Sequence, residues 1–205
     1  MNKIYKLIGA AMIGAPLLML LADVNSLLFE YPRNFWFTTI LLFLSFYAYL
    51  GLIHGLYYLS NATKLALVGT LIASFGVLMG ETIMGLDRVA WAMNEAGLSA
   101  DIDRTVHHPL VFFTSRQLGL TFPIGLIILS IALYKANAIS MITMALLIIG
   151  IVLFPIGRII VGPSANVAGD LIMLLIYGKL GLGVMNNPKY KRDAGNADDA
   201  ELFKR

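Results

Sequence analysis

The chain has 205 residues, of which 59% are hydrophobic and 13% are charged, and its formal net charge is +3. Because soluble domains carry roughly 25% charged residues, this chain has too little polar surface for a water-soluble globule, and we predict an all-α integral membrane protein. The absence of cysteine excludes disulfides, thiolate metal sites and a cysteine nucleophile, and no basic face supports nucleic-acid binding.

Six apolar segments follow one another along the chain, and a helix of roughly 20 residues spans a hydrocarbon core of about 30 Å. The segments are residues 7–28, 35–59, 65–84, 110–134, 139–160 and 167–182. Short turn-forming clusters separate most of them, so neighbouring helices should be antiparallel. The sequence therefore predicts a six-helix transmembrane bundle over residues 1–185, followed by a polar cytoplasmic tail over residues 186–205.

One connection is long, between the third and fourth predicted helices. We expect the third helix to continue to about Gly97 before this loop begins. The start of the fourth helix is open, because residues 114–117 fit a capping box while Pro109 fits a first helical position. Further along, Pro123 and Pro155 could kink the fourth and fifth helices, as Pro16 could kink the first.

The distribution of lysine and arginine predicts the orientation, because cytoplasmic flanks carry the excess of these residues. With the N-terminus inside, ten of the 15 basic residues are cytoplasmic. The five on the other side are Arg33, Arg88, Arg104, Arg116 and Arg158. We therefore predict a multi-pass protein of the cell membrane with both termini cytoplasmic and the long loop outside.

Polar and charged residues in or near the predicted helices gather toward the outer side. Charged groups inside a bilayer are costly, so they usually face the bundle interior or a water-filled cavity. The candidates for ligand binding or a charge network are Asp23, Glu81, Asp87, Arg88, Arg116, Gln117, Arg158, Asn166 and Asp170. Arg158 and Asp170 should pair across a tight turn, either as a structural contact or as part of a ligand site. Glu81, the deepest acid, needs either a cation partner such as Arg116 or a raised pKa that keeps it neutral, and Arg88 lies two turns on along its own face.

Histidines suggest two further kinds of site. The loop residues His107, His108, Asp101 and Asp103 have the side chains of a divalent-metal site, but they lack a regular ligand spacing, which favours a solvated loop. His54 lies between Gly51 and Gly55, where close helix packing favours a packing role. A bis-histidine haem is disfavoured because no second histidine lies at a matching depth. A retinal Schiff base is disfavoured because no lysine lies mid-helix.

Three functions remain open from the sequence. The leading hypothesis is an outward-facing polar cavity that binds or transports a small molecule or lipid, with arginines for an anionic group and Glu81 as a proton-linked partner. The first alternative is an outer-leaflet enzyme that uses the loop of His107 and His108 with nearby carboxylates. The second is an accessory subunit that packs against partner helices. The expected partners are the lipid bilayer, a small molecule or lipid, and a second copy or partner subunit.

Overall fold

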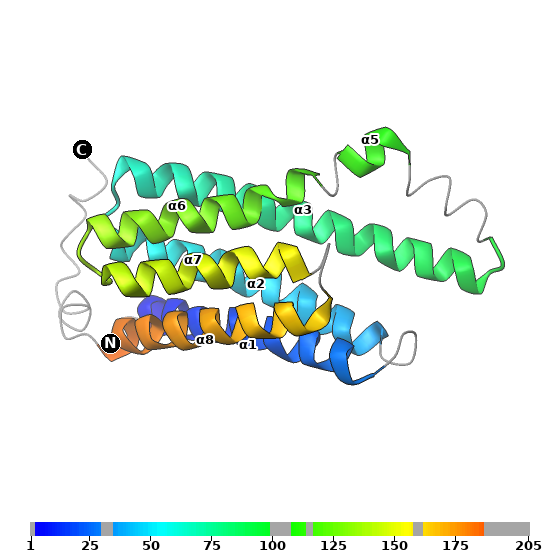
Figure 1. Ribbon diagram of the computed structural model, residues 1–205, viewed down its shortest axis with the longest axis horizontal. Coiled ribbons are helices and arrows are strands. Elements are labelled where there is room, and N and C mark those ends of the chain that lie inside the picture. Colours follow the sequence, from blue (N-terminus) through cyan, green and yellow to red (C-terminus); the bar gives the residue numbers. More distant parts are fainter. Residues whose placement is uncertain (1–2, 30–34, 99–107, 114–116, 158–161, 187–205) are drawn as a thin grey trace.

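The computed structural model describes residues 3–29, 35–98, 108–113, 117–157 and 162–186, and every regular element within them is a helix (Figure 1). The helices are α1 (Lys3–Leu28), α2 (Phe35–Leu59), α3 (Lys64–Glu95), α5 (Pro109–Phe112), α6 (Thr121–Lys135), α7 (Met141–Ile156) and α8 (Pro163–Asn186). Four of them, α1, α2, α3 and α8, are long and apolar enough to cross a membrane, whereas α6 and α7 are shorter apolar helices. The prediction of an all-α membrane bundle is confirmed at this level. Helices suit a bilayer because their backbone groups are satisfied internally.

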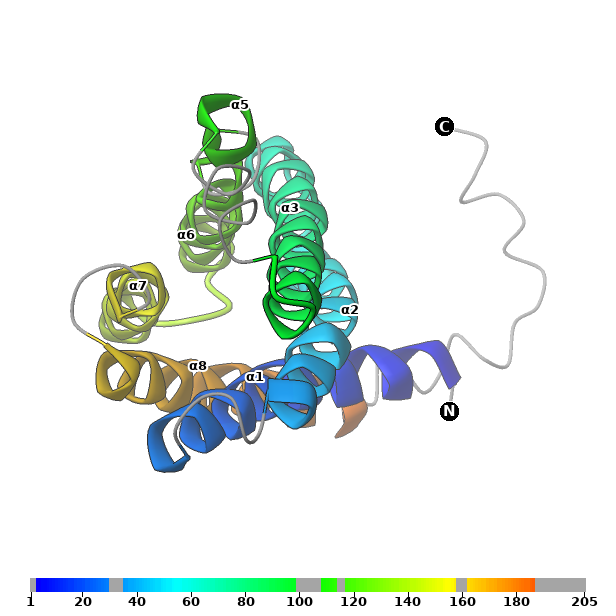
Figure 2. The same ribbon diagram turned by 90° about the vertical axis from the view of Figure 1, so that its right-hand side faces the viewer.

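The six longer helices form a closed ring, which Figure 2 shows in end view. Going round it, α1 packs against α2, α2 against α3, α3 against α6, α6 against α7, and α7 against α8. The ring closes because α8 lies side by side with α1, although the two helices come from opposite ends of the chain (Figure 1). The buried core therefore lies inside the ring, and large apolar side chains cover its outer surface.

The ends of α3 match the predicted third helix and its extension. At the start, the Thr63 hydroxyl accepts a hydrogen bond from the amide of Ala66 at 3.3 Å, which satisfies one of the free donors of the first turn. At the end, Gly97 has a φ of +79°, a left-handed conformation that glycine adopts readily after a helix. The extension of the helix to about Gly97 is confirmed.

The prediction of the fourth helix, whose start was open between Pro109 and residues 114–117, is met in part. The structure has the one-turn helix α5, and α6 begins only at Thr121. Pro123 explains this start, because in the first turn of a helix its missing N–H would have no partner anyway. Pro123 therefore does not kink a long helix, whereas Pro16 and Pro155 do lie inside α1 and α7.

Glycines allow the helices to approach closely. A Cβ atom at Gly9 of α1 would lie 2.7 Å from the carbonyl oxygen of Gly181 in α8. At Gly51 of α2, such an atom would lie 2.6 Å from the Ala11 Cβ, and at Gly55 it would lie 2.7 Å from the Met12 Sδ. These contacts are typical of membrane helices with small residues at their interfaces.

The predicted packing role of His54 is wrong, because its side chain is exposed. The two glycines of this segment face α1 and leave the histidine on the outer surface of the bundle. Its ring lies 5.3 Å from that of Tyr58 in an edge-to-face arrangement. Such amphipathic aromatic residues are enriched where membrane helices meet the interface with water.

A buried serine links α1 and α2. The Ser45 hydroxyl donates a hydrogen bond of 2.8 Å to the carbonyl of Ala15, next to Pro16. We expect Ser45→Ala to lower the free energy of unfolding in detergent by about 1 kcal/mol, because an interhelical hydrogen bond is lost. Ser60→Ala is the matched control, since Ser60 is equally buried but donates to Leu56 in the last turn of α2, the helix that it directly follows. Equal losses in the two variants would contradict the expectation.

Candidate functional site

Two carboxylates are buried toward one end of the ring. At this end of the ring, which we call the Asp170 end, the chain leaves α1, α3 and α7 and enters α2, α6 and α8 (Figure 1). The opposite end is called the Lys135 end. Asp170 in the first third of α8 is fully buried, and Asp23 in the last third of α1 is 3% exposed. A bilayer-spanning bundle has to compensate such groups internally.

Helical periodicity directs both carboxylates to the interface between α1 and α8. Gly9, Pro16 and Asp23 are all buried and recur every seven residues, so they share one face of α1. Gly9 identifies this face, because it packs against Gly181 of α8. On α8, Asp170 lies eleven residues before Gly181, which is close to three full turns. A close backbone contact and the two buried acids thus belong to the same helix pair.

Asn166 adds a third polar group at the Asp170 end. It lies one turn before Asp170 on α8 and is 5% exposed. Its side chain packs against the α-carbon of Gly157, just beyond α7, where a Cβ atom would collide with the Asn166 Oδ1. This amide oxygen is buried and makes no hydrogen bond in the described part of the chain, so it keeps the capacity to accept one.

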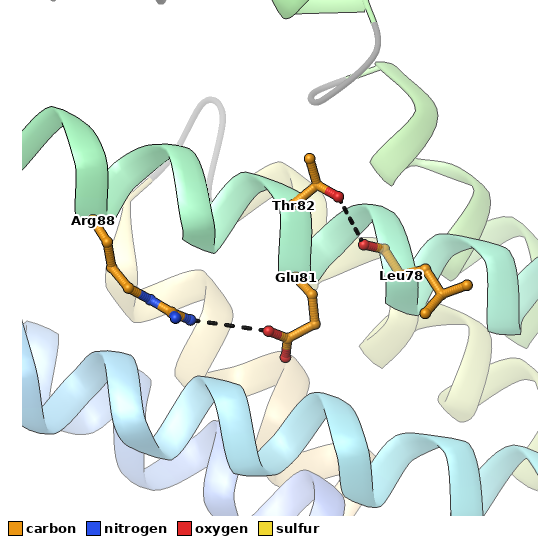
Figure 3. Close-up of polar contacts among 4 residues, drawn as sticks. All are labelled: Leu78, Glu81, Thr82 and Arg88. Carbon is orange, nitrogen blue, oxygen red and sulfur yellow. Dashed lines mark hydrogen bonds and ion pairs between the residues drawn. The ribbon is translucent and has the colours of Figure 1, made fainter.

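An ion pair lies on the face of α3 that is directed toward α2 (Figure 3). The Nη2 of Arg88 is 3.9 Å from the Oε2 of Glu81, and the guanidinium carbon lies 5.4 Å from the ring centre of Phe43 in α2. The side chains are 34% and 19% exposed, respectively, so both are only half-buried. The predicted need of Glu81 for a cation is thus met by Arg88, two turns along the same helix.

This ion pair is too long for a hydrogen bond and leaves polar atoms unsatisfied. The Nε and Nη2 of Arg88 and the Oε1 of Glu81 are buried, and none of them makes a hydrogen bond to a residue that the structure describes. Buried polar atoms are nearly always hydrogen-bonded, and each such exception calls for an explanation. The guanidinium of Arg88, which lies over the ring of Phe43, therefore has N–H donors that could bind an anionic or hydrogen-bond-accepting group.

Aromatic contacts continue the interface of α2 and α3 beyond the ion pair. The rings of Trp36 and Trp91 meet edge to face at 5.4 Å. Nearby, the Asn25 side-chain amide of α1 donates a hydrogen bond of 2.8 Å to the Thr38 hydroxyl of α2. Tryptophan is enriched at the membrane–water interface, so the two tryptophans of the chain were a sequence signal that could have indicated this region. The contacts themselves were not predicted.

Several predicted site residues are not brought into this arrangement. Gln117 is exposed before α6, and His108 is exposed before α5. Asp87 belongs to α3, but its side chain is outside the described part. Also outside the described residues are Asp101, Asp103, His107, Arg116, Arg158 and the tail from residue 187. Among the residues that are described, no three histidine or carboxylate side chains form a group that could hold a metal.

No protein-family model, curated protein or solved structure matches this chain. The inference of function therefore depends on the side chains described above. Chemically, the Asp170 end combines two buried carboxylates, an unsatisfied amide oxygen and a guanidinium with free donors. Such a set can bind a polar or anionic group inside a bilayer.

Proposed function

We propose that the chain is a six-span protein of the cell membrane whose Asp170 end faces outward, and that this end binds or transports a small molecule or lipid. The helices α6 and α7 would complete the six spans. They have 15 and 16 residues, hence a length of about 22–24 Å, and they lie in the ring between the longer apolar helices. Both termini would then be cytoplasmic, in agreement with the excess of lysine on that side.

The observation that carries this proposal is the position of the charges. Four charged side chains in the described part are buried or half-buried, namely Asp23, Glu81, Arg88 and Asp170. All four lie toward the Asp170 end, whereas the described lysines are exposed. Because charges inside a bilayer are costly, their concentration on one side of a bundle favours a functional site over independent packing contacts.

Arg88 is the group that would recognise the ligand. Its planar guanidinium offers several donors, and it binds a carboxylate or phosphate more strongly than a neutral partner. Glu81 would compete with such a ligand for Arg88, since the ion pair is only loosely formed at 3.9 Å. A bound anion would therefore favour a protonated Glu81, which would link binding to the uptake of a proton.

The test is native mass spectrometry of the protein released from nanodiscs that contain phosphatidylglycerol and phosphatidylcholine. We expect a retained anionic lipid or small molecule, and we expect Arg88→Gln to reduce its occupancy about tenfold or more, because a charged hydrogen bond contributes about 1.5–3 kcal/mol. Lys64→Gln is the matched control, because Lys64 is an exposed cation at the other end of the same helix. No retained molecule, or equal retention in the two variants, would contradict the proposal.

A further inference from the structure

Four aromatic rings meet in the interior of the bundle. The ring of Phe122 in α6 lies 4.9 Å from Tyr49, 6.1 Å from Phe46 and 6.0 Å from Phe154, all nearly edge to face. These rings, which we call the Phe122 cluster, come from α2, α6 and α7, and none is more than 9% exposed. Helices on different sides of the ring in Figure 2 thus meet through one side chain.

Backbone contacts hold Phe122 in place from the side of α3. A Cβ atom at Gly76 would collide with the backbone nitrogen and α-carbon of Phe122, and one at Gly125 would collide with the backbone of Ala73. Phe46 in turn lies over Gly80, where a Cβ atom would be 2.7 Å from the edge of its ring. The cluster is therefore enclosed by α3 as well, and no lateral shift of α3 is possible without moving Phe122.

Polar groups lie on both sides of this cluster. Toward the Asp170 end are the ion pair of Glu81 and Arg88, which lies beyond Gly76 on α3, and the Asn166 amide. Asp170, in contrast, follows Gly169, which packs against Phe154, and so lies level with the rings. Toward the Lys135 end, Ser130 lies two turns beyond Phe122 on α6, and Tyr177 lies two turns beyond Asp170 on α8. Both are fully buried; the Ser130 hydroxyl donates a hydrogen bond of 2.8 Å to the carbonyl of Leu126, and the Tyr177 hydroxyl makes none within the described part of the chain. An apolar layer of rings thus separates two polar regions of the same interior.

Two of the four rings lie beside a proline. Phe122 precedes Pro123, and Phe154 precedes Pro155 inside α7. Proline removes one backbone hydrogen bond and marks the usual position of a bend in a helix. Phe122 therefore lies where α6 begins, and Phe154 lies where α7 can bend. The distance of 6.0 Å between their ring centres can thus change with little loss of backbone hydrogen bonding.

We infer that the Phe122 cluster is the barrier of a transport path that leads from the polar site at the Asp170 end to the Tyr177 and Ser130 hydroxyls. This inference rests on the proposed function and selects transport over simple binding. In the closed state the rings block passage of a polar solute, because an apolar constriction excludes water. Movement of Phe154 with the bend at Pro155 opens it.

The natural absence of cysteine makes this inference testable by single-cysteine labelling in intact cells. Ser130→Cys places a thiol on the inner side of the rings, and Asn25→Cys places one near the outer end of α1. A membrane-impermeant methanethiosulfonate reagent is added outside. We expect N25C to be labelled and S130C to be protected. Adding Phe122→Ala to S130C should raise its labelling from background to the rate of N25C.

Phe75→Ala is the matched control, since this phenylalanine of α3 is 42% exposed on the outer surface and its removal should leave S130C protected. If F122A does not fold, Phe154→Ala removes a ring from the edge of the cluster instead. Labelling of S130C with all four rings intact would overturn the barrier, and so would its protection in a folded F122A or F154A protein. Neither result changes the retention measured with R88Q, so the two proposals fail separately.

Discussion

Replacing Gly76 with leucine is expected to lower the free energy of unfolding by about 3 kcal/mol, because overpacking of a close contact strains the backbone. Any side chain at this position of α3 meets the backbone of Phe122 in α6. A flexible side chain could move aside, whereas a helix backbone cannot move without separating the two helices. The same change should also displace the Phe122 cluster.

The measurement is thermal unfolding of the purified protein in a mild detergent, and Gly85→Leu is its control. Gly85 lies in the same helix, but a Cβ atom there would find nothing within 4 Å. The substitutions at Gly76 and Gly85 therefore change helix propensity by the same amount and differ only in their effect on packing. We expect G85L to unfold within about 0.5 kcal/mol of the unmodified protein. Equal destabilisation of G76L and G85L would show that α3 and α6 do not pack as described.

The second large effect is expected at the hairpin of α7 and α8. Arg158→Ala and Asp170→Asn should each lower the free energy of unfolding by about 3 kcal/mol, because removing one partner of a buried ion pair leaves the other uncompensated. Asp170 is fully buried on α8, and Arg158 lies two residues after the end of α7 in the sequence. The pairing of these two residues is a prediction from the sequence.

A double-variant cycle distinguishes this pair from two independent contributions. If Arg158 and Asp170 interact, the double variant should lose little more stability than either single variant, because the second change removes the uncompensated charge. Glu95→Gln, at the exposed end of α3, controls for the loss of a carboxylate as such. Two single variants with unchanged melting temperatures, or two fully additive losses, would show that the pair hypothesis is wrong.

Local sequence signals predicted the helix ends well where a single residue dominates the backbone. Gly97 marks the predicted end of α3, since a left-handed glycine acts on the nearest turn alone, whereas the cap at Thr63 was not predicted. The start of the fourth helix stayed open from the sequence, because continuous hydrophobicity does not say where a helix begins. There, the position of Pro123 had more influence than the apolar run.

The candidate site was predictable in its residue types but not in its partners. That Glu81 needs a cation follows from its place in an apolar segment, and Arg88 on the same face was one of the options. The contact of Arg88 with Phe43 and the meeting of Phe122 with Tyr49 depend on how helices are rotated against each other. His54 failed for the same reason, since spacing alone does not say which face of α2 turns outward.

The side-by-side position of α1 and α8 has a consequence for biosynthesis. A chain made from its N-terminus delivers α1 long before α8 exists, so the face with Gly9 and Asp23 has no α8 to cover it during most of translation. Contacts between distant parts of a sequence form late and leave incomplete species open to aggregation. Nascent chains that stop before Pro163 should therefore depend on the insertion machinery or a chaperone to shield the acid on α1, and should be degraded faster than the full chain.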